Sequence, residues 1–197
     1  MKFKMPKKTT INSRITTVRN SAFNGILPIE KPDSDDIKFI EMLLKTKNGR
    51  FLCGYCGKTE ATETDHINPL IIAGKPSGYI HEISNLIPVC GSCNSIKSNL
   101  TITDFFENDK FKLKVGDKLD ERKLTFDQYT KYFENKYGKV VKLNFEEIID
   151  EKLWNDYLDK TSEIFELMKS SSEMYIEIKE QLKKYYIEHR VELKEKK

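Results

Sequence analysis

Apolar residues recur at helical spacing in three stretches of this chain. Ser34 could cap a helix in which Ile37, Ile40 and Leu44 share one face, and Asn48-Gly49 would end it. Two further stripes with a period near 3.6 lie towards the C-terminus, and they comprise Trp154, Tyr157, Leu158, Ile164, Phe165 and Met168, and then Tyr175, Ile178, Leu182, Tyr185 and Tyr186. We expect these faces to pack on each other or on a second subunit.

The middle of the chain follows a different pattern. Residues 62–67 and 85–89 predict two short strands, and the proline and glycine residues of segment 68–84 predict a loop between them. A helix is expected to begin near Gly91, and sequences typical of helix caps start at Thr125, Asn144 and Ser170. A strand, loop, strand and helix of under about 50 residues rarely folds unaided, so a metal staple is expected.

Charge is distributed unevenly along the chain. The net charge is +3, but residues 1–32 hold seven basic residues against the single acid Glu30 and so carry +6. This segment shows little periodicity, and we expect an irregular basic arm that binds a polyanion. The alternative is a solvated tail whose lysines only keep it soluble.

Composition narrows the class of protein. Of the 197 residues, 38% are hydrophobic and 33% are charged, and no apolar run approaches the about 20 residues of a membrane span. The N-terminus has no apolar region typical of a secretory signal, so a cytoplasmic location and no membrane partner are expected. All four cysteines fall in two Cys-x-x-Cys pairs, and in a reducing compartment this pattern favours metal binding over disulfides.

The cysteine spacing predicts a structural zinc site. Cys53 and Cys56 form one pair, Cys90 and Cys93 form the other, and 33 residues separate the pairs. Four thiolates leave zinc no open position, so this metal would stabilise the fold and take no part in catalysis. Two separate redox pairs are the alternative, although no thioredoxin-like βαβ pattern surrounds them.

Polar residues between and after the cysteine pairs carry a family resemblance. They are Asp65-His66-Ile-x-Pro, Asn85-Leu, and Asn94-x-x-Lys97 directly after Cys93. In this order the run resembles the HNH endonucleases, also called ββα-metal nucleases, over roughly residues 50–107. The third signature position holds Asn94 where the family name implies His, as in many similar members. The resemblance implies a zinc-stapled ββα-metal core. Together with the helical patterns that follow it, this core predicts an α+β fold with a largely helical C-terminal region.

The resemblance also implies roles for the polar residues. His66 would be the general base that takes a proton from water, and Asn85 would orient its imidazole through the side-chain carbonyl. Asp65 and Asn94 would bind one Mg²⁺ or Mn²⁺ ion, for which oxygen ligands are suited. The products would carry 5′-phosphate and 3′-hydroxyl ends.

Several of these polar residues keep a second interpretation. Asn85 and Asn94 could be a strand-end cap and a helix cap. Lys97 could contact a DNA phosphate or could be a solvated helix residue. His81 and His189 have no motif around them and receive no catalytic role.

The remainder of the chain indicates a type II restriction endonuclease. We expect a basic arm at 1–32, a helix with the nuclease core at 33–107, and a mostly helical region at 108–197 for DNA recognition or dimerisation. The partner would be double-stranded DNA, with Lys97, Arg14 and Arg19 as DNA-binding candidates. Cutting both strands of a palindrome implies a homodimer. The rivals are a phage or mobile-element HNH nuclease that nicks with loose specificity, and a non-catalytic zinc-stapled DNA-binding protein.

Overall fold

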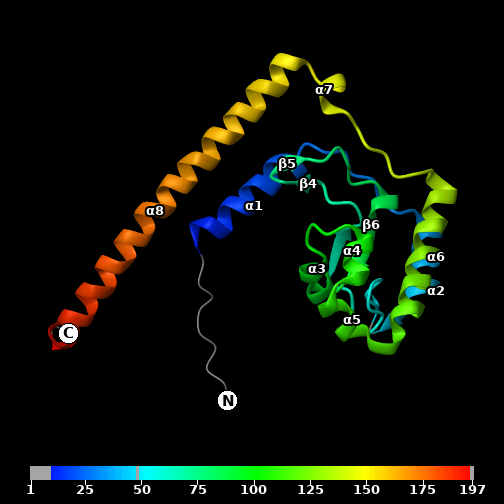
Figure 1. The fold of residues 1–197 in the computed structure, drawn as a ribbon, viewed down its shortest axis with the longest axis horizontal. Coiled ribbons are helices and arrows are strands. Elements are labelled where there is room, and N and C mark those ends of the chain that lie inside the picture. The colour runs from blue at the N-terminus through cyan, green and yellow to red at the C-terminus, as the bar shows by residue number, and fades with distance from the viewer. Residues whose placement is uncertain (1–9, 48, 196–197) are drawn as a thin grey trace. The chain divides into compact units, whose positions relative to one another are not determined.

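A computed structural model describes residues 10–47 and 49–195 of the protein (Figure 1). The chain divides into two compact units. The core unit comprises Ile26–Ile148, and the helical unit combines Met1–Gly25 with Ile149–Lys197. None of the described helices is long and apolar enough to cross a membrane.

Two antiparallel strands and one short helix form the centre of the core unit. Strand β3 (Glu63–His66) pairs with β6 (Leu86–Val89), and His66 lies opposite Leu86. Helix α3 (Gly91–Lys97) begins almost directly after β6. The strand, loop, strand and helix predicted from the sequence are therefore present.

The connection between β3 and β6 has more structure than the predicted loop. It contains a small hairpin of β4 (Ile71–Ile72) and β5 (Lys75–Pro76), and the 3₁₀ helix η1 (Ile83–Asn85) leads into β6. Another hairpin, β1 (Thr46–Lys47) and β2 (Arg50–Phe51), precedes the first cysteine pair.

An aromatic cluster joins the ββα unit to the surrounding helices. The ring of Tyr55 lies 4.7 Å from that of Phe105, which lies 4.2 Å from that of Phe111, and all three side chains are fully buried. The structural boundary at Ile148 therefore differs from the predicted boundary at residue 107, because the helices beyond 107 complete the core. Besides α3 and η1, the described helices of this unit are α2 (Ser34–Leu44), α4 (Ile102–Glu107), α5 (Asp109–Val115), η2 (Gly116–Lys118), α6 (Leu119–Tyr137) and α7 (Phe145–Ile148).

The prediction of an irregular arm at residues 1–32 is wrong over residues 11–24, because helix α1 (Ile11–Asn24) forms there. Thr10 caps this helix, and its side chain and that of Ser13 each accept a hydrogen bond from the other's backbone. The pattern was missed because Ser replaces the usual Glu or Gln at the third helical position. Residues 1–9 lie outside the described residues.

Helix α8 (Glu151–Glu195) is the largest element of the helical unit and packs against α1. The Tyr157 hydroxyl donates a 2.6 Å hydrogen bond to the carbonyl of Ala22, and the rings of Phe23 and Tyr157 meet edge to face. The largely helical C-terminal region predicted from the apolar stripes is confirmed.

The predicted helix starts are only partly correct. Asp33, and not Ser34, caps α2, because its carboxylate accepts hydrogen bonds from the backbone of Asp35 and Asp36. Thr125 and Ser170 lie in the interior of α6 and α8, so neither residue marks the start of a helix. A polar residue three positions before Glu or Gln is common inside helices too, so this signal alone does not locate a helix start.

We expect Tyr129→Phe to lower the free energy of unfolding of the core unit by about 1–2 kcal/mol. The Tyr129 hydroxyl, on a side chain that is 1% exposed, donates a 2.8 Å hydrogen bond to the carbonyl of Leu86 in β6. Removing it leaves that carbonyl without this partner. Urea unfolding of the zinc-loaded protein measures the change.

Tyr132→Phe is the matched control for this substitution. Tyr132 lies on the same helix and stacks on Phe39, and within the described part of the chain its hydroxyl makes no hydrogen bond. Equal effects of the two substitutions would show that the Tyr129 hydrogen bond does not stabilise β6.

Candidate active site

The four cysteine sulfurs converge at one buried point. All lie within 4.8 Å of one another, and the Sγ atoms of Cys56 and Cys90 are 4.0 Å apart. Four sulfurs in a tetrahedron around zinc, with Zn–S bonds of 2.3 Å, are separated by about 3.8 Å. The cluster therefore fits one zinc ion, and its geometry favours a single closed centre over two separate redox pairs.

Basic side chains surround this cluster. The Lys114 ammonium lies 3.3 Å from Sγ of Cys90, where it would offset the net negative charge of a zinc ion with four thiolates. The buried Arg122 guanidinium donates hydrogen bonds to the carbonyls of Gly54 and Tyr55, at 3.1 and 3.0 Å. These contacts fasten the first cysteine pair to α6 and the second pair to α5.

Asp65 and Lys97 form a buried pair between β3 and α3. An Asp65 carboxylate oxygen accepts a 2.8 Å hydrogen bond from the Tyr55 hydroxyl and lies 3.7 Å from the Lys97 ammonium. Burial raises the pKa of Asp65, while Lys97 acts in the opposite direction. The same ammonium donates to the backbone carbonyl of His66 at 3.1 Å.

Both interpretations offered for Lys97 are wrong. The residue is fully buried, so it neither lies in solvent nor presents its charge to a DNA phosphate at the surface. It turns inward because α3 packs the side that holds Cys93 and Lys97 against the core.

Asn85 is fully buried and holds the chain that follows β3. Its side-chain oxygen accepts from the backbone and the amide of Asn68, at 2.7 and 3.2 Å, and its amide donates to the carbonyls of Asn68 and Ile80. The oxygen is thus occupied by Asn68, and the expected contact with the His66 imidazole is not found. Asn85 supports the histidine through the backbone.

The partner of the His66 imidazole is His81, which sequence reasoning left without a role. Nε2 of His66 lies 2.8 Å from Nδ1 of His81. Burial lowers the pKa of His66 to about 4, and the charges of His81 and Lys97 act in the same direction. His66 is therefore neutral at neutral pH, as a proton acceptor must be.

Asn94 has an acidic neighbour that sequence reasoning also missed. Its amide donates a 2.6 Å hydrogen bond to the carboxylate of Glu63. Glu63 and Asp65 are two residues apart in β3 and so point to the same face of the strand, and this alternation could have revealed Glu63. Because a carboxylate only accepts, the contact fixes which end of the Asn94 amide is the oxygen.

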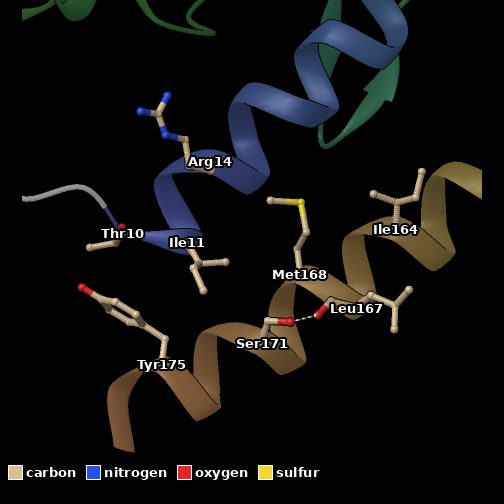
Figure 2. Close-up of a pocket in the computed structure, with 8 residues that line it drawn as sticks. All are labelled: Thr10, Ile11, Arg14, Ile164, Leu167, Met168, Ser171 and Tyr175. Carbon is tan, nitrogen blue, oxygen red and sulfur yellow. Dashed lines mark hydrogen bonds between the residues drawn. The ribbon is translucent and has the colours of Figure 1, made fainter. Parts of the chain in front are cut away.

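The two arginine candidates belong to the helical unit. The Arg19 guanidinium lies 4.8 Å from the centre of the Phe165 ring. Arg14 is exposed at the edge of a groove of about 540 Å³ between α1 and α8. Figure 2 shows Ile11 and Met168 extending into the space between these helices while the Arg14 guanidinium points away from α8.

The ββα unit thus carries a cluster of four cysteines and an Asp-His pair at the end of its first strand. Residues 53–100 match the family model of the HNH endonuclease, so the chain contains an HNH endonuclease domain there. The match covers less than half of the chain and identifies this domain alone. No curated protein and no solved structure matches the chain.

We expect purified protein to contain about one zinc ion per chain, bound by the four cysteines. Cys93→Ser should abolish zinc binding and unfold the core unit, because zinc binding worth about 10–16 kcal/mol in small domains is folding energy. Elemental analysis and circular dichroism measure the two effects. Ser92→Ala, an exposed position in the same helix, should change neither. Folded wild-type protein without zinc would disprove the assignment.

Proposed function

We propose that this chain is a type II restriction endonuclease that hydrolyses phosphodiester bonds of double-stranded DNA at a specific sequence. The observation that carries the proposal is the Asp65-His66 pair at the end of β3, inside an HNH domain. The segments before and after this domain would supply surfaces for choosing a sequence and pairing subunits.

Asp65 and Asn94 would hold one Mg²⁺ or Mn²⁺ ion. The donor set fits, because carboxylate and amide oxygens are ligands of such ions. One Asp65 oxygen is bound by Tyr55, which leaves the other, and Glu63 fixes the amide of Asn94 through its nitrogen. The ion, when bound, would stabilise the negative charge that develops on the phosphate and the leaving oxygen.

His66 would act as the general base. Its free ring nitrogen takes a proton from a water molecule as the water oxygen attacks phosphorus, and the bond to the 3′-oxygen breaks. The products are a 5′-phosphate and a 3′-hydroxyl. Asn85 and Lys97 hold the backbone around this histidine from two sides, through Asn68 and through the His66 carbonyl.

DNA binding outside the active site would use the helical unit. Arg14 is exposed and Arg19 is held over Phe165, so both can present charge to phosphates. Lys97 is withdrawn as a DNA contact because it is buried.

Helix α8 would provide the dimer interface. Six of its apolar side chains are 47–69% exposed, and their spacings of three, four or seven residues place them on one face. Two of the six, Ile164 and Leu167, also line the groove between α1 and α8. The six are Ile164, Leu167, Met174, Ile178, Leu182 and Tyr185.

We expect His66→Ala to reduce DNA cleavage by about 10²–10⁴-fold, because proton transfer is lost, while folding and DNA binding remain. Plasmid digestion with Mg²⁺, followed by sequencing of the ends, measures cleavage. His189→Ala is the matched control, since His189 lies on exposed α8 outside the HNH domain. A His66→Ala variant that cuts at the wild-type rate would exclude His66 as the base.

The same digestion separates the three candidate functions. Discrete fragments with 5′-phosphate ends support a restriction enzyme. Nicked or smeared plasmid supports a nuclease of loose specificity. Binding without cleavage supports a zinc-stapled DNA-binding protein.

We expect Ile178→Lys to weaken dimerisation at least about tenfold, because a charge would be buried in an apolar interface. Ile176→Lys is the matched control: both isoleucines are 56% exposed, but they lie about 160° apart around the helix. Sedimentation velocity, with and without a duplex that carries the cleavage site, measures the assembly. A wild-type chain that stays monomeric in both conditions while breaking both strands would contradict the dimer.

A further inference from the structure

Two histidines, 15 positions apart in the chain, meet through their side chains. Nε2 of His66 and Nδ1 of His81 are 2.8 Å apart, with ring centres separated by 4.8 Å. The backbone of His81 is held in place, because its carbonyl accepts a 3.0 Å hydrogen bond from the Glu30 amide and it forms an isolated bridge with Ile29. The contact is therefore built into the fold of the core unit.

Asn85 fixes both histidine-bearing segments at once. Its side chain binds Asn68, two residues after His66, and the carbonyl of Ile80, one residue before His81. A single buried amide thereby sets the spacing between the two imidazoles. The family resemblance implied that Asn85 orients the His66 imidazole by direct contact. In the structure, Asn85 instead holds the two segments that carry His66 and His81.

The direction of the hydrogen bond decides whether His66 can act. A neutral imidazole has one N–H donor and one lone pair. If His81 donated to Nε2 of His66, that bond would occupy the lone pair of His66, and its other nitrogen would carry the hydrogen. If His66 donates through Nε2, the lone pair on its Nδ1 stays available for water.

We propose that His81 is a positioning residue for the general base, whose Nδ1 accepts the hydrogen bond from Nε2–H of His66 and holds His66 in the tautomer with a free Nδ1. This inference rests on the proposed function, in which His66 is the base. His81 then needs its own hydrogen on Nε2. When Nδ1 of His66 takes the proton of water, Nε2–H becomes the donor of a charge-assisted and stronger bond to His81.

Two substitutions of His81 distinguish the effect of its hydrogen bond from the effect of its ring shape. His81→Asn can place an amide oxygen where Nδ1 lies, so the acceptor is retained, whereas His81→Phe keeps a ring of similar size without an acceptor. We expect His81→Phe to cut plasmid DNA ten to a hundredfold more slowly, a part of the about 10²–10⁴-fold that a base supplies. His81→Asn should recover most of this loss. Equal activity of His81→Phe and the wild type would overturn the proposal.

Nitrogen NMR gives a readout that does not depend on cleavage. The chain has three histidines, so the spectra of His81→Phe and His189→Ala assign all of the imidazole signals. We expect His66 of the zinc-loaded wild type to be the Nε2–H tautomer, and we expect a mixture of tautomers in His81→Phe. A wild-type His66 that carries its hydrogen on Nδ1 would overturn the proposal, even if His81→Phe failed to fold.

The two proposals fail in different ways. If His66→Ala cuts normally, the base assignment fails whatever the tautomer is. If His66→Ala is inactive while His81→Phe keeps the wild-type rate and fold, only the role of His81 fails. Zinc content and circular dichroism of each variant establish that the core unit is intact.

Discussion

Four cysteine sulfurs within 4.8 Å of one another connect the loop before β3 to the start of α3. The strands between these points pair over only four residues each, too few to hold the ββα unit together by themselves. A zinc ion on these sulfurs would fix both ends of the unit. The aromatic side chains of α4, α5 and α6 then cover its other side and complete the core.

Buried polar groups connect the cysteine cluster and its surroundings to the candidate catalytic residues. Arg122 binds the backbone of the first cysteine pair, Lys97 binds the carbonyl of His66, and Asn85 binds Asn68 and Ile80. Each is costly to bury without partners, and each has partners in backbone carbonyls that would otherwise lack them. The segment that carries His66 is therefore held from several directions by buried polar groups.

The sequence predicted the parts of the site that depend on local spacing. Two Cys-x-x-Cys pairs and the Asp65-His66 pair are visible as motifs, and the strands and the helix follow from nearby patterns. The inward turn of Lys97 and the contact of His81 with His66 depend on how distant segments pack, and no local signal records them. Helix α1 was not predicted for another reason. Thr, Asn and Arg interrupt its apolar positions, and the apolar side of this helix packs against α8.

Helix α3 combines three tasks in seven residues: Cys93 belongs to the thiolate centre, Asn94 to the candidate magnesium site, and Lys97 to the support of His66. One inserted residue would rotate everything beyond it by about 100° and would separate these tasks. Changes in length are therefore tolerable only outside this helix, for example in the β4–β5 hairpin. In evolution such a module would be inherited as an indivisible block, and changes in length would accumulate in the surrounding chain.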